Sequence, residues 1–121
     1  MMDFATASAG DIAAAIRDKQ VSSVEVTQAA LNRLQQAHEK CNSVVAFENE
    51  EALAAAKKAD EAVAAGEELG PIHGVPLAHK DMFDRVGKIP SWGGNIQPDK
   101  PASEDATLIA RLKAAGSHQI A

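Results

Sequence analysis

The strongest constraint on the fold is the composition of residues 70–101, which hold five of the eight glycines and all five prolines of the chain. Proline inside a helix removes a backbone hydrogen bond and clashes with the preceding turn, so no regular helix is expected to cross this segment. Any regular helices are therefore expected before or after it. Within the segment, residues 75–79 follow Gly74 and are the best candidate for a strand.

Helical patterns occupy most of the remaining chain. Apolar residues that recur at spacings of three and four predict helices at about residues 8–19, 23–38, 50–65 and 105–115. Ser22 and Glu25 form a capping-box pattern, in which a hydroxyl and a glutamate three residues later bond each other's backbone N–H groups. Ser8 stands at the same distance before Asp11. Ser103, which two acidic residues follow, is expected to cap the last helix.

A second strand is predicted to start within residues 118–121, directly after the last helix. A strand, a crossover with a helix and a second strand are the unit of a parallel sheet, which is buried on both faces and needs several strands. The sequence therefore predicts an α/β fold: N-terminal helices, then the start of a mixed or parallel sheet that is cut off in its second strand. We expect residues 1–121 to be the N-terminal part of a single domain.

Charge and hydropathy argue against several classes of partner. The net charge is −5 and no basic run is present, which argues against direct binding of nucleic acid or anionic membranes. No stretch approaches the roughly 20 apolar residues of a membrane span, and no secretory signal follows Met1. The single cysteine, Cys41, cannot form an internal disulfide, which favours a cytoplasmic location.

Residues 70–81 read Gly-Pro-Ile-His-Gly-Val-Pro-Leu-Ala-His-Lys-Asp. This segment resembles the amidase-signature family, whose members share the pattern G-P-[LI]-x-G-[VI]-P-[LIV]-x-x-K-D. Residues 22–26 are similar to the family's second helix. Residues 105–107 and 111–116 are similar to the helix and turn that follow its substrate loop. The resemblance covers essentially the whole chain in the right order.

The resemblance implies a Ser–cis-Ser–Lys triad. One serine attacks the amide carbonyl, a second serine on a cis peptide bond relays its proton to the lysine, and a glycine- and serine-rich loop holds the oxyanion. Lys80 stands at the position of the catalytic lysine, whereas both serines would lie beyond Ala121. Residues 1–121 alone are therefore expected to be inactive. No cofactor and no metal is implied.

General chemistry agrees with a catalytic role for Lys80. A free lysine has a pKa of about 10.4 and is protonated at neutral pH, but burial disfavours the charged form. The carboxyl end of a parallel strand is where open α/β sheets usually gather ligands. Serine–lysine pairs are a known variant of the serine–histidine–acid arrangement. We therefore expect Lys80 to enter a largely dry site in the completed enzyme.

Other residues near Lys80 are candidates for supporting roles. Asp81 is expected to be structural, either pairing with a cation or accepting bonds from nearby backbone N–H groups. Trp92, Gly93 and Gly94 correspond to the family's loop beside the active site. Trp92 forms either a pocket wall or a hydrophobic plug, two alternatives that the sequence leaves open. Ser91 lacks the glycine- and serine-rich surroundings expected of the nucleophile.

The sequence gives little indication of a metal site. His73 and His79 are six residues apart, but zinc sites normally need three or four ligands and no recognisable spacing completes the set.

Two residues beside Lys80 depart from those common in the family, namely His79 and Met82. These departures leave the subfamily and the substrate open.

The leading interpretation is an amidohydrolase that converts carboxylic-acid amides to acid and ammonia, with this chain supplying only the lysine. One alternative is the amidase subunit of a glutamyl-tRNA amidotransferase. Another is a noncatalytic helical interaction module derived from an amidase. The expected partner is a small-molecule amide substrate. A homo-oligomer or a missing C-terminal remainder is also considered.

Overall fold

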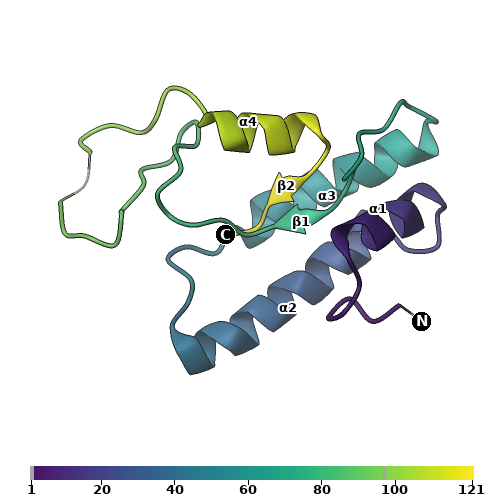
Figure 1. Cartoon of the computed structure of the whole chain (residues 1–121), viewed down its shortest axis with the longest axis horizontal. Helices are drawn as coiled ribbons and strands as arrows, with labels where there is room; N and C mark the ends of the chain where they lie inside the picture. Colours follow the sequence, from purple (N-terminus) through teal and green to yellow (C-terminus); the bar gives the residue numbers. More distant parts are fainter. Residues whose placement is uncertain (1, 97) are drawn as a thin grey trace.

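The computed structural model describes residues 2–96 and 98–121. Over these residues the elements follow in the order α1 (Ala9–Arg17), α2 (Ser23–Cys41), α3 (Asn49–Ala64), β1 (Pro76–Leu77), α4 (Thr107–Ala114) and β2 (His118–Gln119). The two strands lie between α4 on one side and the N-terminal helices on the other, and the long loop between β1 and α4 projects away from them (Figure 1). The predicted α/β fold is confirmed.

The strands β1 and β2 form a parallel pair, with Pro76 opposite His118 and Leu77 opposite Gln119. The Ile120 N–H donates to the Leu77 carbonyl at 3.0 Å, just past the end of β2. Both strands are shorter than the predicted ranges of 75–79 and 118–121. Beyond the first strand the chain turns at Lys80, whose carbonyl accepts from the Met82 N–H at 2.7 Å.

The caps of α1 and α2 match the sequence patterns. Both capping boxes form, one between Ser8 and Asp11 and the other between Ser22 and Glu25. The expectation for Ser103 is wrong, because α4 has Ala106 at its N-cap position and no side-chain cap.

The acidic residue beside that cap position is engaged elsewhere. Asp105 accepts a bond from the Val86 N–H at 2.8 Å and pairs with Lys113 at 2.8 Å. Its carboxylate therefore ties the long loop to α4.

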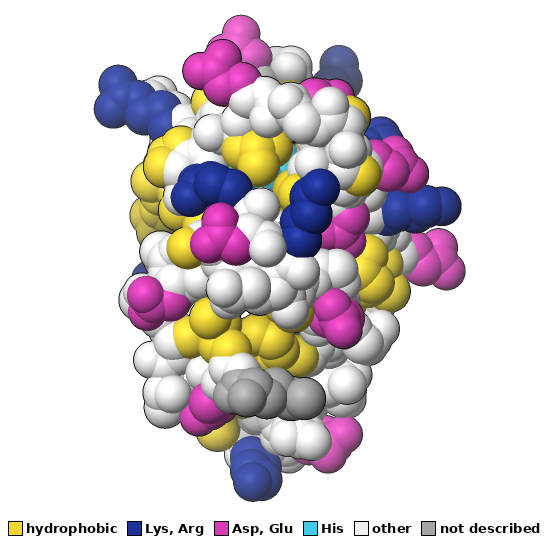
Figure 2. Space-filling view, turned by 90° about the vertical axis from the view of Figure 1, so that its right-hand side faces the viewer, with side chains coloured by type: hydrophobic (Ala, Val, Ile, Leu, Met, Phe, Trp, Pro, Cys, Tyr) yellow, Lys and Arg dark blue, Asp and Glu magenta, His cyan; other side chains and the backbone are white. Residues whose placement is uncertain are grey.

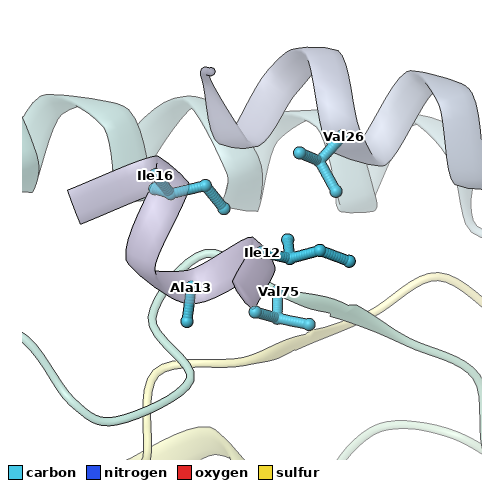
Figure 3. Close-up of a cluster of buried hydrophobic side chains, with 5 residues drawn as sticks. All are labelled: Ile12, Ala13, Ile16, Val26 and Val75. Carbon is cyan, nitrogen blue, oxygen red and sulfur yellow. The ribbon is translucent and has the colours of Figure 1, made fainter. Parts of the chain in front are cut away.

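Two small apolar clusters hold the strands to the helices. In the first, side chains from α1 and α2 meet one from the residue before β1 (Figure 3); its members are Ile12, Ala13, Ile16, Val26 and Val75. In the second, Leu31 of α2 and Ala52 of α3 pack with Ile120 after β2. The helices thus hold the chain just before β1 and just after β2.

Two glycines allow the segment before β1 to approach the turn between α4 and β2 closely. Gly70 lies in the first of these segments and Gly116 in the second. A Cβ added at Gly70 would lie 2.2 Å from the Ala115 carbonyl oxygen. Gly116 has φ +101°, and a Cβ there would lie 2.7 Å from the Cα of His73. The Gly74 N–H donates to the Gly116 carbonyl at 2.9 Å. This contact brings the start of β1 beside the start of β2.

The surface carries mixed charges and several exposed apolar side chains. Figure 2 shows one face on which small apolar groups alternate with basic and acidic side chains. Across residues 2–96 and 98–121, every helix is too short or too polar to span a bilayer.

Candidate active site

Lys80 follows β1 by three residues and lines a cleft with a volume of about 970 Å³. The tight turn after it is closed by the bond between the Met82 N–H and the Lys80 carbonyl. The Lys80 side chain is exposed. The dry environment expected in the completed enzyme is thus not formed by the described residues of this chain alone.

Asp81 binds the loop that returns to the cleft. Its Oδ2 accepts a hydrogen bond from the Ser91 N–H at 2.9 Å and another, very short, from the Ser91 hydroxyl. The Asp81 main-chain carbonyl accepts from the Trp92 N–H at 3.1 Å. Of the two structural roles left open by the sequence, the structure has Asp81 accepting bonds from backbone N–H groups. Ser91 is engaged as the partner of this carboxylate.

The three predicted pocket residues differ in position. Trp92 and Gly93 line the cleft, whereas Gly94 is not among its lining residues. Trp92 has φ +55° and a side chain that is 65% exposed. In this chain Trp92 is therefore not a buried plug that fixes the loop. Its exposed indole stands at the rim of the cleft.

An ion pair that sequence reasoning missed forms another part of the cleft wall. Both Nη atoms of Arg85 donate to the carboxylate of Glu48, at 2.8 and 2.5 Å. The side chains are 13% and 8% exposed, so the pair is largely removed from water. The Arg85 hydrogen bonds are the main cause that lowers the pKa of Glu48, and the same bonds raise the pKa of Arg85. The two residues are 37 positions apart, so no local sequence pattern predicts that they form an ion pair.

The two histidines considered for metal binding lie in separate environments. His73 Nε2 lies 2.9 Å from the Ala59 carbonyl oxygen. His79 is half-buried in the cleft wall, and its buried Nδ1 has no hydrogen-bond partner among the described residues. Burial, followed by the charge of Arg85, lowers the pKa of His79. Over the described ranges, three or more His, Cys, Asp or Glu side chains nowhere gather closely enough to hold a metal ion.

The site therefore combines a lysine after a parallel strand, a clamped loop and an open cleft. A sequence model of the amidase family, described as Amidase, matches residues 25–121. The chain belongs to the amidase family. Its amidase-signature segment is the one that places Lys80 beside the cleft.

Curated relatives of this amidase-family chain include proteins named as a subunit of glutamyl-tRNA(Gln) amidotransferase. One from Alkalilimnicola ehrlichii is 44% identical over 106 residues, which are 88% of this chain and 22% of the relative. One from Azoarcus sp. is 39% identical over 111 residues, which are 92% of this chain and 23% of the relative. The chain thus spans less than a quarter of the length of these relatives.

Solved structures of the family agree with the fold. The peptide amidase from Stenotrophomonas maltophilia superposes with a TM-score of 0.86 at 27% sequence identity, covering 97% of this chain and 24% of that one. The arrangement of helices and parallel strands described above is therefore an amidase-signature arrangement.

Proposed function

We propose that this chain supplies the general base of an amide-hydrolysing site, and that Lys80 is that base. The observation that carries the proposal is the position of Lys80 at the carboxyl end of β1, where its side chain lines an open cleft of about 970 Å³. Ligand sites of open α/β sheets gather at such strand ends. Membership of the amidase family gives the reaction class. We also infer that residues 1–121 contribute to one domain.

The chemistry we propose is that of a Ser–cis-Ser–Lys triad. A serine Oγ attacks the amide carbonyl carbon and forms a tetrahedral intermediate. Its proton passes through a second serine to the neutral amine of Lys80, which returns a proton to the departing ammonia. Water then releases the acid from the acyl-enzyme. Both serines would come from parts of an amidase that this chain does not contain.

Ser91 is not expected to be the nucleophile. The Ser91 hydroxyl donates to the Asp81 carboxylate, which orients it toward the loop. Covering the cleft with further protein would also remove Lys80 from water. An amine works as a base only in its neutral form, which burial favours.

A second candidate function is the amide-transferring reaction of an amidotransferase. It is favoured by relatives at 39% and 44% identity whose names place them in glutamyl-tRNA(Gln) amidotransferase. The amide donor would then be glutamine, and partner subunits would be required. Ammonia release from glutamine but not from simple amides would select this function over general amide hydrolysis. We infer a cytoplasmic location for both candidates, because the single cysteine Cys41 is free.

The test is the substitution of Lys80 in a full-length amidase polypeptide that carries residues 1–121. Lys80→Ala is expected to lower turnover by about 10²- to 10⁴-fold, the usual contribution of general-base assistance. Lys80→Arg should fail almost as badly, because arginine keeps the charge but does not deprotonate in proteins. Ammonia release is measured, and circular dichroism checks folding.

Lys57, an exposed lysine on α3, offers the matched control, and Lys57→Ala should leave turnover unchanged. Residues 1–121 alone should release no ammonia, since triad members act as a unit. Near-normal turnover of Lys80→Arg would show that Lys80 acts only through its positive charge, and it would contradict the proposed mechanism.

A further inference from the structure

Glu48 occupies an unusual position at the start of α3. It is the N-cap residue of that helix, but its side chain caps no helix N–H group. Its backbone N–H donates to the Ile120 carbonyl at 3.1 Å, directly beyond β2. Its carboxylate is 8% exposed and is directed to Arg85 instead. One residue thus joins the end of the sheet to the loop after Lys80.

Arg85 receives this carboxylate with both arms of its guanidinium. Paired N–H···O bonds of this kind fix orientation as well as distance, which a lysine cannot do. Lys88 adds a longer contact, with its Nζ 3.5 Å from Glu48 Oε1. The pair is shielded from water, so salt and solvent weaken it less than an exposed pair.

The segment that carries Lys80 is fixed at both ends by these contacts. At its start, the Leu77 carbonyl accepts from the Ile120 N–H at 3.0 Å, and at its end Arg85 is held by Glu48. Between them the turn at Lys80 is closed by the bond from the Met82 N–H to the Lys80 carbonyl, and Asp81 is tied to Ser91 and Trp92. Lys80, Glu48 and Arg85 all line the same cleft.

We propose that Glu48 is a positioning residue for Lys80: through Arg85, it holds the turn that presents the lysine to the cleft. This inference rests on the proposed function for its catalytic meaning. That Glu48 orders residues 80–88 is a structural statement, which can be tested without any activity. Glu48 touches neither substrate nor reacting atoms in this scheme.

The test is amide hydrogen exchange, followed by mass spectrometry, on the 121-residue chain. Glu48→Gln keeps the size of the side chain and removes the charge that Arg85 binds. We expect exchange in residues 80–88 to rise by about tenfold or more, as for the loss of a hydrogen bond between charged groups. Peptides from α1 and α2 should exchange as in the wild type.

The matched control is Glu51→Gln, which removes the same charge from the same end of α3. Glu51 binds Lys88 at 2.9 Å, but its side chain is 66% exposed. Exposed pairs contribute little, so exchange in residues 80–88 should stay near the wild-type rate. The double substitution Glu48→Arg with Arg85→Glu should restore part of the protection that either single substitution removes.

Arg85→Lys serves if Glu48→Gln fails to fold, because it keeps the charge and loses the paired geometry. Unchanged exchange in residues 80–88 would overturn the proposal. Exchange that rises equally in α1 and α2 would also overturn it, because the pair would then only stabilise the whole fold.

A second measurement separates this inference from the proposed function. In a full-length amidase that carries this segment, Glu48→Gln should lower kcat by about 10- to 100-fold, the cost of a misplaced catalytic group. KM should change little, since the residue makes no substrate contact. If Lys80→Ala retained activity while the exchange result held, the proposed function would fail and the ordering role of Glu48 would remain.

Discussion

His118 carries its imidazole into the interior of the molecule, where Nε2 lies 2.9 Å from the Thr27 hydroxyl oxygen. Burial, and then the charge of His73, lowers the pKa of His118 from its usual value of 6.5. The unfolded chain therefore binds a proton at a higher pH than the folded chain. The contribution of neutral His118 to the free energy of unfolding is therefore fully present above about pH 6.5. It is lost as the pH falls from there toward the lowered pKa of His118.

We predict that the free energy of unfolding of the chain decreases between about pH 7.5 and about pH 5. His118→Gln keeps a polar side chain but cannot titrate, so its decrease should be smaller than that of the wild type. Part of the decrease should remain, because burial also lowers the pKa of His79. Urea denaturation followed by circular dichroism measures both. An identical pH dependence in the two proteins would contradict the prediction.

The residues of the site differ in how far the sequence predicts them. Lys80 and Asp81 stand in a local motif, so their proximity to each other and to a strand end could be expected. The clamp from Asp81 to Ser91 spans only ten positions, but its geometry depends on how the loop folds. The Glu48–Arg85 pair depends on the packing of α3 against the loop. No periodicity or spacing encodes a contact of that kind.

At the scale of the elements, the N-terminus of α2 shows how a second helix completes a cap. The Ser22 hydroxyl accepts from the Glu25 N–H at 3.1 Å, as the capping box predicts. The Asp60 carboxylate, from α3, accepts from the Ser23 N–H at 2.6 Å and the Val24 N–H at 3.1 Å. Together these side chains bind three of the four N–H groups that a helix start leaves free.

We predict that Asp60→Ala destabilises the chain more than Ser22→Ala. The first removes two charge-assisted hydrogen bonds and should lower the free energy of unfolding by about 2–3 kcal/mol. The second removes one cap at an exposed site and should cost about 1 kcal/mol. Urea denaturation of the two variants gives the comparison. A larger loss for Ser22→Ala would show that the local box, and not the contact with α3, secures α2.

The helices are more predictable than the strands because their signals are local. The predicted helix at residues 23–38 is found as Ser23–Cys41, and that at 50–65 as Asn49–Ala64. Each strand has only two residues, and its extent depends on the partner strand. Ser103 failed as a cap because α4 starts later, at Thr107. The close approach of Gly70 to Ala115 also depends on the packed structure.

At the scale of the whole molecule, the apolar residues without cover are not those of the sheet. Val75 is 3% exposed and belongs to the core, whereas the large exposed apolar side chains concentrate in the loop between β1 and α4. Val86, Ile89, Trp92 and Ile96 are 57%, 42%, 65% and 93% exposed. The chain spans 22% and 23% of two curated relatives, and in a longer amidase more protein would be available to cover this loop.

We predict that the 121-residue chain self-associates through this loop as its concentration rises, because neighbouring exposed apolar side chains favour association over hydration. Replacing Trp92 and Ile96 together by serine should shift the distribution toward monomer. Val45→Ser is the control, since Val45 is 70% exposed but lies between α2 and α3, outside the loop. It should leave the distribution as in the wild type.

Sedimentation velocity over a range of concentrations measures the distributions, and circular dichroism confirms that the variants remain folded. A wild-type chain that stays a single monomeric species at every concentration would contradict the prediction. If Val45→Ser reduced association as strongly as the double substitution, the loop would not be the contact surface. Association would then follow from total apolar exposure and not from the residues of this loop.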